Sequence, residues 1–385
     1  MQKRISLFIV LSTFFQLLCG QQEPILQEEH PFTLAASYVG DAYGNAAGGL
    51  KKGAGFMGMG NLMIDFDTEK AHWWNGGNFF INGATIHGKS LSENFSGDLQ
   101  IASNIDAGTH VYMHEFWFKQ KINKISFTLG LQDLNADFVR TENGAEFINS
   151  SFGIPPVLSG NLPVPIFPLT GLGVSFQWNI NQTLSWQTAA FDGYQEPFEH
   201  NPYNLHWNFS HNDGMFAITE FQAKVNMKGK EGTYKLGAYY HSGLNQHDEE
   251  TQTITPVFKN NYGFYLIADQ TVFEQGHRKT GLFAQVAVTP NHNGENKSNH
   301  YFGLGANIFG VFSKKKNDAL GFAVAHTGLK ASSYRYETAL ELYYNCHFNE
   351  NFAIQPDIQY ILCPSGAATK LHNALIGMVR FHIHF

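Results

Sequence analysis

Long segments in which apolar and polar side chains alternate dominate the C-terminal end of this chain. In residues 334–348 one face of the pattern is aromatic or aliphatic, while the other carries charged residues such as Glu337 and Glu341. Successive side chains of a β-strand point to opposite faces, so this spacing predicts a strand with one apolar and one charged face. Residues 350–362 and 371–385 repeat the pattern, and three such segments joined by turns predict an antiparallel sheet.

The same alternation predicts about sixteen strands between residue 55 and the C-terminus. Most of them have about 10–16 residues, more than the five or six that are typical of soluble proteins. About ten residues, tilted by about 45°, are what a lipid bilayer requires of a spanning strand. The predicted strands are residues 55–67, 76–87, 97–105, 109–121, 124–134, 168–180, 182–193, 213–228, 232–243, 259–274, 279–290, 299–312, 317–327, 335–348, 350–362 and 371–385.

The predicted connections alternate between short turns and long loops, which is typical of an outer-membrane barrel. Two connections depart from this rule, because residues 88–96 form a long connection where a short one is expected and residues 106–108 do the reverse. A barrel of this size encloses an aqueous channel, so apolar side chains should face lipid and charged ones the interior. The fold class predicted is therefore all-β, a transmembrane antiparallel β-barrel, with a soluble β-sandwich as the alternative.

Composition agrees with a barrel and excludes several other classes. Apolar residues make up 43% of the chain and charged residues 15%, yet no run of 18 apolar residues follows the N-terminal segment. The mean hydropathy of −0.23 excludes a helical-bundle membrane protein. A net charge of −7 argues against nucleic acid as a partner, because phosphate binding requires clustered Lys and Arg.

Three regions are predicted along the chain. Residues 1–20, with Lys3 and Arg4 before an apolar stretch, read as a secretory signal peptide, while lipid attachment at Cys19 is the less favoured alternative. Residues 21–54 are rich in Gly and Ala and show no clear alternation, so they are expected to form a periplasmic segment or a partial plug. Residues 55–385 are expected to form the barrel.

Several blocks of the chain resemble the carbohydrate-selective porins (OprB-type). They are the 337–344 segment, the Pro-Asp-Ile-Gln-Tyr block at 356–360, the 147–153 segment with its following prolines, and Gly48-Gly-Leu50. The resemblance covers most of residues 40–385. It implies a sixteen-stranded outer-membrane channel for the passive diffusion of sugars. Trp73-Trp74 and the many histidines are not expected features of this family, so the particular sugar stays open.

The longest predicted connection, residues 135–167, should fold inward and form the constriction, by analogy with general porins. Prolines between 155 and 168 stiffen it, and charged side chains offer hydrogen-bond partners to sugar hydroxyls. Each residue could equally serve only to hydrate the lumen. The candidate substrate-binding residues are Asp137, Arg140, Glu142 and Glu146 in the loop and Arg335, Glu337, Glu341, Asp357 and Arg380 on the wall.

No enzymatic chemistry is predicted, and three alternatives stay open: a general non-selective porin, a membrane-embedded hydrolase barrel and a secreted β-rich binding protein. No catalytic motif appears, and His382 with His384 lacks a third ligand for a metal ion. No catalytic residue, metal site or cofactor is therefore expected. The expected partners are sugar solutes and outer-membrane lipid. An aromatic outer wall would suit a homotrimer, and the sequence does not choose between monomer and trimer.

Overall fold

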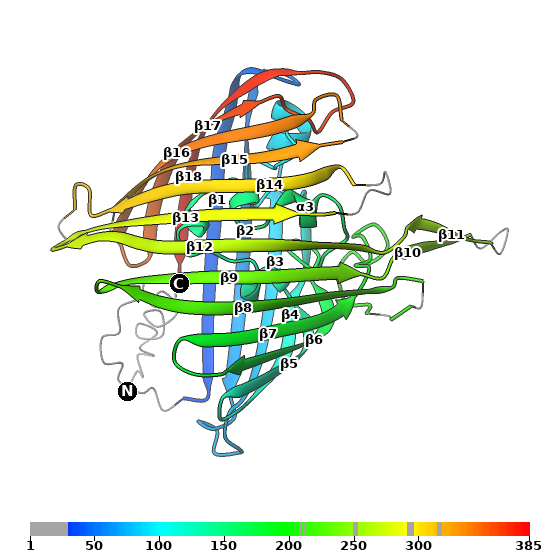
Figure 1. Cartoon of the computed structure of the whole chain (residues 1–385), viewed down its shortest axis with the longest axis vertical. Coiled ribbons are helices and arrows are strands. Elements are labelled where there is room, and N and C mark those ends of the chain that lie inside the picture. The colour runs from blue at the N-terminus through cyan, green and yellow to red at the C-terminus, as the bar shows by residue number, and fades with distance from the viewer. Residues whose placement is uncertain are drawn as a thin grey trace, which may run out of the picture.

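The computed structural model describes residues 30–207, 209–210, 212–248, 253–290, 296–313, 318–330 and 332–385, and the predicted signal peptide lies outside them. Within these ranges, sixteen strands form a closed antiparallel barrel (Figure 1). Each strand pairs with its neighbours along the chain, and the ring closes where β1 (Phe32–Gly49) pairs with β18 (His372–His384). The all-β barrel prediction is confirmed. No helix in the described ranges is long and apolar enough to cross a membrane.

Long strands follow one another around the ring, and one small hairpin lies outside it. The hairpin consists of β10 (Leu244–Asp248) and β11 (Thr253–Phe258), between β9 and β12. The other barrel strands are β2 (Gly53–Asp67), β3 (Gly77–Gly88), β4 (His110–Ile122), β5 (Ile125–Gln132), β6 (Gly171–Asn179), β7 (Leu184–Asp192), β8 (Met215–Met227), β9 (Lys230–His241), β12 (Asn261–Gln275), β13 (Arg278–Val288), β14 (Ser298–Phe309), β15 (Asp318–Leu329), β16 (Tyr336–Asn349) and β17 (Phe352–Leu362).

The structure corrects two predicted boundaries. Residues 21–54 were expected outside the barrel, but β1 lies inside that range and pairs along most of its length with both β2 and β18. Its alternation is hidden because small residues occupy both faces. At Gly40 this smallness is required, since a Cβ atom would lie 2.4 Å from the ring of Phe381. The predicted strand at 97–105 is wrong, because this segment is irregular chain inside the barrel.

With β1 in place, the two exceptions to the connection rule disappear. The predicted loop 88–96 and turn 106–108 belong to one long connection, residues 89–109, between β3 and β4. One rim of the barrel, the short-connection rim, carries two-residue turns such as 123–124, 228–229 and 276–277. The opposite, long-connection rim carries connection 89–109 and the longest connection, 133–170. Both of these connections fold into the barrel.

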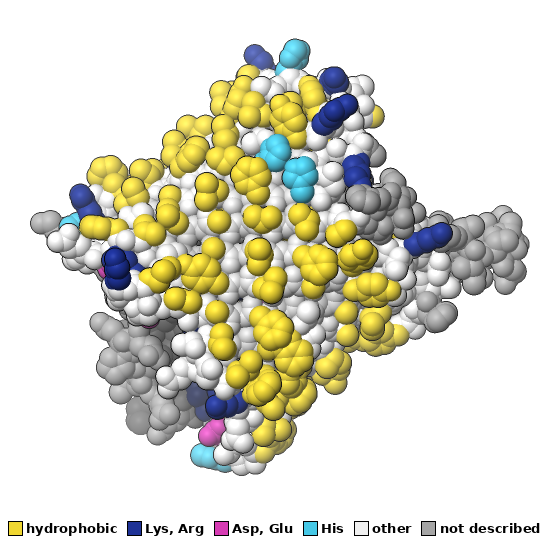
Figure 2. All heavy atoms as spheres, in the orientation of Figure 1, with side chains coloured by type: hydrophobic (Ala, Val, Ile, Leu, Met, Phe, Trp, Pro, Cys, Tyr) yellow, Lys and Arg dark blue, Asp and Glu magenta, His cyan; other side chains and the backbone are white. Residues whose placement is uncertain are grey.

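The outer wall of the barrel is apolar, as the alternation predicts. Figure 2 shows apolar side chains spread over the visible face of the barrel. Leu342 and Ile358 on this wall are 45% and 54% exposed, whereas Glu341 and Asp357 on the inner face are 0% and 2% exposed. The sign of the pattern is therefore that of a barrel in lipid rather than of a soluble sandwich.

Candidate functional site

Two connections of the long-connection rim fold into the barrel and fill part of its interior. Connection 89–109 contains a short π-helical turn, η1 (Ser92–Ser96). Connection 133–170 contains four short helices: α2 (Leu134–Asp137), η2 (Gly144–Glu146), η3 (Ser150–Phe152) and α3 (Pro156–Ser159). Leu91, Phe138, Ile148, Phe152 and Leu158 from these loops are at most 1% exposed. Between the loops and the wall, the interior is therefore a packed apolar core rather than water.

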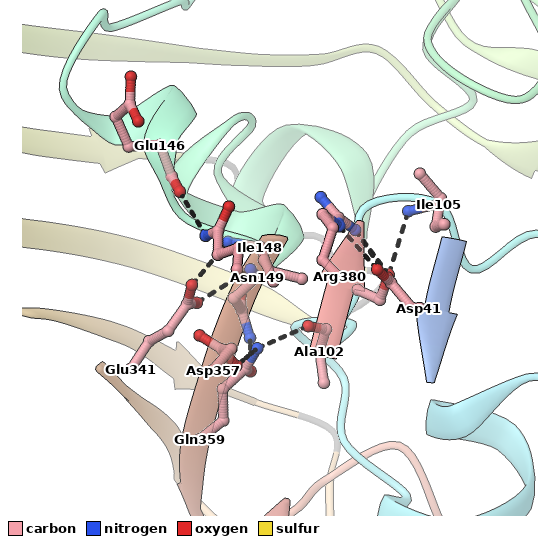
Figure 3. A network of polar contacts seen from close by, with 12 residues as sticks. Asp41, Ala102, Ile105, Glu146, Ile148, Asn149, Glu341, Asp357, Gln359 and Arg380 are labelled. Atoms are coloured by element: carbon pink, nitrogen blue, oxygen red, sulfur yellow. Dashed lines mark hydrogen bonds and ion pairs between the residues drawn. The ribbon is translucent and has the colours of Figure 1, made fainter. Parts of the chain in front are cut away.

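Glu341 on β16 holds connection 133–170, here called the constriction loop, against the wall (Figure 3). Its carboxylate accepts the backbone N–H of Ile148 at 2.6 Å and that of Asn149 at 2.9 Å. The side chain of Asn149 also donates to Gln359 on β17 at 3.1 Å. Charge-assisted hydrogen bonds of this kind are stronger than neutral ones, so the inward fold of the loop depends on this buried carboxylate.

Two more wall carboxylates bind the beginning of the same loop. Asp269 on β12 accepts the backbone N–H of Asn143 at 2.9 Å and the side-chain donors of Thr141 and Asn143. Glu220 on β8 accepts the backbone N–H of Val139 at 3.0 Å. The loop is therefore fixed at several points along its length.

Connection 89–109 is fixed in the same way by Glu337 on β16. This carboxylate accepts the backbone N–H of Leu99 at 2.9 Å and that of Gln100 at 2.8 Å. It also accepts the backbone N–H of Ser365 at 2.6 Å, from the connection between β17 and β18. One side chain thus joins two connections to the wall.

A buried ion pair lies at the seam where the first and last strands meet. Both Arg380 Nε and Arg380 Nη2 lie 2.7 Å from the carboxylate oxygens of Asp41, which is 0% exposed. Asp41 also accepts the hydroxyl of Ser103 at 2.6 Å, so this pair holds connection 89–109 as well. Asp357 lies nearby on β17, where Gln359 Nε2 donates to it at 3.2 Å.

The structure brings the nine candidate residues together only in part. Asp137 and Glu142 are exposed on the constriction loop, and Arg140 and Glu146 are partly buried there. Burial raises the pKa of Glu146 to about 7, although the nearby Lys279 opposes the shift. The placement of Arg335 on the inner wall is wrong, because this exposed residue lies in the connection before β16.

The remaining four candidates face the interior as expected, but the loops cover them. They are Glu337, Glu341, Asp357 and Arg380, none more than 5% exposed. Sequence reasoning missed Asp41, the partner of Arg380, and the two loop-binding carboxylates Glu220 and Asp269. The alternation within β8 and β12 places the last two on the polar face, whereas Asp41 was lost with the strand that carries it.

The other side of the interior stays accessible along β2 and β4. Strand register places Asp65, Glu115, Trp117 and Lys119 on the inner face there, and all four are only partly buried. Lys119 and Asp137 of the constriction loop line the same small cavity. A basic wall residue therefore lies close to an acidic loop residue at the edge of the open lumen.

Two larger cavities lie on the long-connection side of the loops. One has a volume of about 210 Å³ and lies between the two inward-folded connections, with Asp106, Asp133 and Asn135 in its lining. The other has a volume of about 770 Å³ and is lined by Glu93, Asp98 and Asp106 among others. Burial raises the pKa of both Asp98 and Asp106. In the residues that the structure describes, no cluster of three potential ligands fits a metal ion.

Comparison with known proteins decides what this barrel is. The family model described as "Carbohydrate-selective porin, OprB family" matches residues 51–385. The chain belongs to this family. Its members are outer-membrane β-barrel porins of Gram-negative bacteria, so the predicted function and location of this porin are confirmed. It allows selective diffusion of carbohydrates across the outer membrane.

Individual relatives agree with the family. "Porin B" of Pseudomonas aeruginosa is 24% identical, and the match covers 95% of this chain and 90% of the relative. The high-pH structure of Pseudomonas putida OprB superimposes with a TM-score of 0.80 at 22% identity, covering 92% of this porin and 94% of that chain. An OmpT variant of Vibrio cholerae that lacks loop L8 has the same fold more distantly, with a TM-score of 0.52 at 9% identity, over 92% of this porin and 100% of that chain.

Proposed function

We propose that sugars cross this porin passively, without covalent chemistry, through the part of the lumen that the two inward-folded connections leave open. The observation that carries the proposal is that the inward-folded connections cover the wall around Glu337 and Glu341. Because Glu341 and Glu337 bind loop backbone and are 0% exposed, a solute meets a different part of the wall, along β2 and β4. There it passes between the wall and the exposed edge of the constriction loop.

Asp137, Arg140, Glu142 and Glu146 on the loop set the selectivity, together with Asp65, Glu115 and Lys119 on the wall. Sugars are neutral and carry many hydroxyl groups, so they are bound by donors and acceptors on two sides of a narrow passage. Each contact must be weak enough for the solute to leave, and exposed side chains in water meet this condition.

The covered residues act differently in this proposal. Glu337, Glu341, Asp357 and Arg380 determine where the loops lie, and hence the width of the passage, without touching the solute. This separation gives two classes of variant. Changes in the exposed loop residues should alter the preference among solutes, whereas changes in the covered residues should enlarge or destabilise the passage.

Liposome swelling tests the proposal. Liposomes that contain the protein should swell faster in a monosaccharide than in an amino acid of similar size. The Asp137→Asn/Glu142→Gln variant should lose part of this preference, while the exposed Glu231→Gln on the short-connection rim should keep it. Equal swelling of the wild type in both solutes would reduce the protein to a general porin.

We propose that the outer wall contacts membrane lipid directly, in a monomer or in a homotrimer that uses part of this wall between copies. Spin labels at residues 342 and 358 should report an apolar, oxygen-rich environment in bilayers. A label that reports bulk water at both positions would contradict lipid contact. Light scattering with correction for detergent distinguishes the monomer from the trimer.

A further inference from the structure

One sector of the long-connection rim is strongly basic. It consists of four neighbouring connections, which precede β2, β14, β16 and β18 around the ring. In sequence these connections contain six Lys or Arg and one acidic residue, Glu295. Their basic residues, all of them exposed, are Lys51, Lys52, Lys297, Lys330, Arg335 and Lys370.

The rest of the rim does not share this charge. Connection 193–214, between β7 and β8, carries Glu196, Glu199 and Asp213 and has no Lys or Arg in its sequence. In Figure 2, dark blue side chains follow the edge of the barrel beside the grey segments, and no magenta side chain is visible along that edge. The basic sector is therefore a local feature, in a protein whose net charge is −7.

Backbone and ring contacts hold three of these connections side by side. The N–H of Lys330 donates to the carbonyl of Lys297 at 3.0 Å. The hydroxyl of Tyr334 donates to the carbonyl of Leu371 at 2.5 Å, and the ammonium of Lys370 lies 5.5 Å from the centroid of the Tyr334 ring. Basic side chains gathered along one stretch of the rim raise the local positive potential, which attracts an anion.

The outer wall below this sector changes step by step from polar to apolar. Directly below the rim lie Tyr336, His326 and His300, with the rings of His326 and Tyr336 stacked at 5.5 Å. Below them follow Leu304 and Leu342, which are 54% and 45% exposed. Charge, then rings, then aliphatic side chains is the order in which a lipid presents headgroup, interface and acyl chain.

We propose that this sector, the basic sector of the rim, binds the phosphate groups of lipid headgroups in the leaflet that surrounds it. Lys330, Arg335 and Lys370 supply the cations, Tyr336 lies at the interface, and the wall beneath receives acyl chains. Arg and Lys near a membrane surface attract anionic headgroups, and Arg forms bidentate hydrogen bonds with phosphate.

An anionic solute on its way into the channel is the less favoured ligand. The cavity of about 770 Å³ just inside this rim is lined by Glu93, Asp98 and Asp106, with Lys297 as the basic residue of the lining. An anion that the rim attracted would meet this acidic lining before it reached the constriction. The charge pattern therefore suits a ligand that stays outside the barrel.

Native mass spectrometry of the delipidated protein in detergent tests the proposal. The probes are diphosphorylated lipid A and the same lipid without its phosphates. The wild type should retain the phosphorylated lipid in preference, and the K330Q/R335Q/K370Q variant should lose about 10- to 100-fold of that preference. A matched K70Q/K121Q/K228Q variant, with three exposed lysines of the short-connection rim replaced, should keep it.

Two further measurements separate this proposal from its alternatives. Sugar-driven liposome swelling should be unchanged in K330Q/R335Q/K370Q, which shows that the barrel is folded and open. Inorganic pyrophosphate and glucose 6-phosphate at millimolar concentration should not displace the lipid from the wild type. Glucose 6-phosphate should pass through K330Q/R335Q/K370Q as fast as it passes through the wild type. Equal retention of both lipids by the wild type, an equal loss in the matched variant, or slower glucose 6-phosphate flux with unchanged lipid binding would each overturn the proposal.

Discussion

At the scale of single residues, the buried carboxylates of the wall serve the loops rather than the solute. A charged side chain that two or three backbone N–H groups surround is fully used as an acceptor. Glu341 and Glu337 have this arrangement, and Asp269 accepts one backbone N–H together with the side-chain donors of Thr141 and Asn143. The aperture is therefore determined by residues that a sugar does not touch.

Replacing Glu341 by Ala should loosen the constriction loop. Each hydrogen bond to a carboxylate contributes about 1.5–3 kcal/mol, and the variant leaves the N–H groups of Ile148 and Asn149 without an acceptor. Single-channel conductance should rise, and larger oligosaccharides should pass. The Glu231→Ala variant, on the short-connection rim, should conduct as the wild type does. An unchanged conductance in Glu341→Ala would show that packing and the other hydrogen bonds hold the loop without Glu341.

Removal of one member of the Asp41–Arg380 pair should destabilise the closed barrel strongly. Breaking a buried pair leaves an uncompensated charge and costs about 3–5 kcal/mol. Arg380→Met should therefore lower the temperature at which the folded band disappears in semi-native electrophoresis. The double variant Asp41→Asn/Arg380→Met should recover part of that stability, whereas additive losses in the double variant would argue against direct coupling of the two residues.

Glu146 should make the channel sensitive to pH near neutrality. Its pKa is raised from 4.5 to about 7 by burial, so the folded chain holds this proton at pH values where the unfolded chain has released it. The free energy of unfolding therefore falls as the pH rises from about 4.5 to about 7, and it levels off above. Cation preference of the channel should grow around pH 7, the folded pKa, as Glu146 in the folded protein becomes charged. A pH titration of reversal potential should lose this step in Glu146→Gln and keep it in Glu142→Gln.

At the scale of elements, strand periodicity was sufficient for most of the barrel. The alternation predicted β2 and the strands from β3 to β18 of the ring to within a few residues, because each has large apolar side chains on its outer face. It failed at β1, where Gly and Ala replace them, and at 97–105, where an irregular segment alternates by coincidence. The inward course of the constriction loop was expected by analogy with general porins, from its length and its place after the fifth predicted strand. The contacts of Glu341 and Asp41 did not follow, because they join positions 193 and 339 residues apart.

The position of β1 in the wall can be tested by cysteine labelling. In a background with Cys346 and Cys363 replaced by Ala, Leu34→Cys and Ala42→Cys should react with a lipid-soluble maleimide and resist a charged one in intact outer membranes. Both side chains are exposed on the outer face of β1. Lys52→Cys, at the rim, is the control that should react with the charged reagent. Rapid reaction of residue 34 with the charged reagent would show that this segment is exposed to water, as the sequence predicted, and is not a strand of the wall.

At the scale of the whole molecule, the barrel is divided lengthwise into two unlike halves. The half from β8 through β18 to β1 carries packed loops inside, and much of it has basic connections on its rim. Elsewhere in the ring, β2 and β4 keep partly exposed polar side chains on the inner face, and connection 193–214 after β7 is acidic. The proposed solute path and the proposed lipid contact use different residues of one ring, which allows either to be altered by mutation without the other.

The seam between β1 and β18 has a consequence for how the protein matures. Asp41 and Arg380 come from the opposite ends of the chain, and the hydroxyl of Ser103 in an inward-folded connection is held by their pair. The inward-folded connections therefore reach their final position only after the last strand has been synthesised, translocated and paired with the first. An assembly intermediate in which β1 and β18 are not yet paired would pass solutes without selectivity. Closure of the ring and the gain of selectivity therefore occur in the same step.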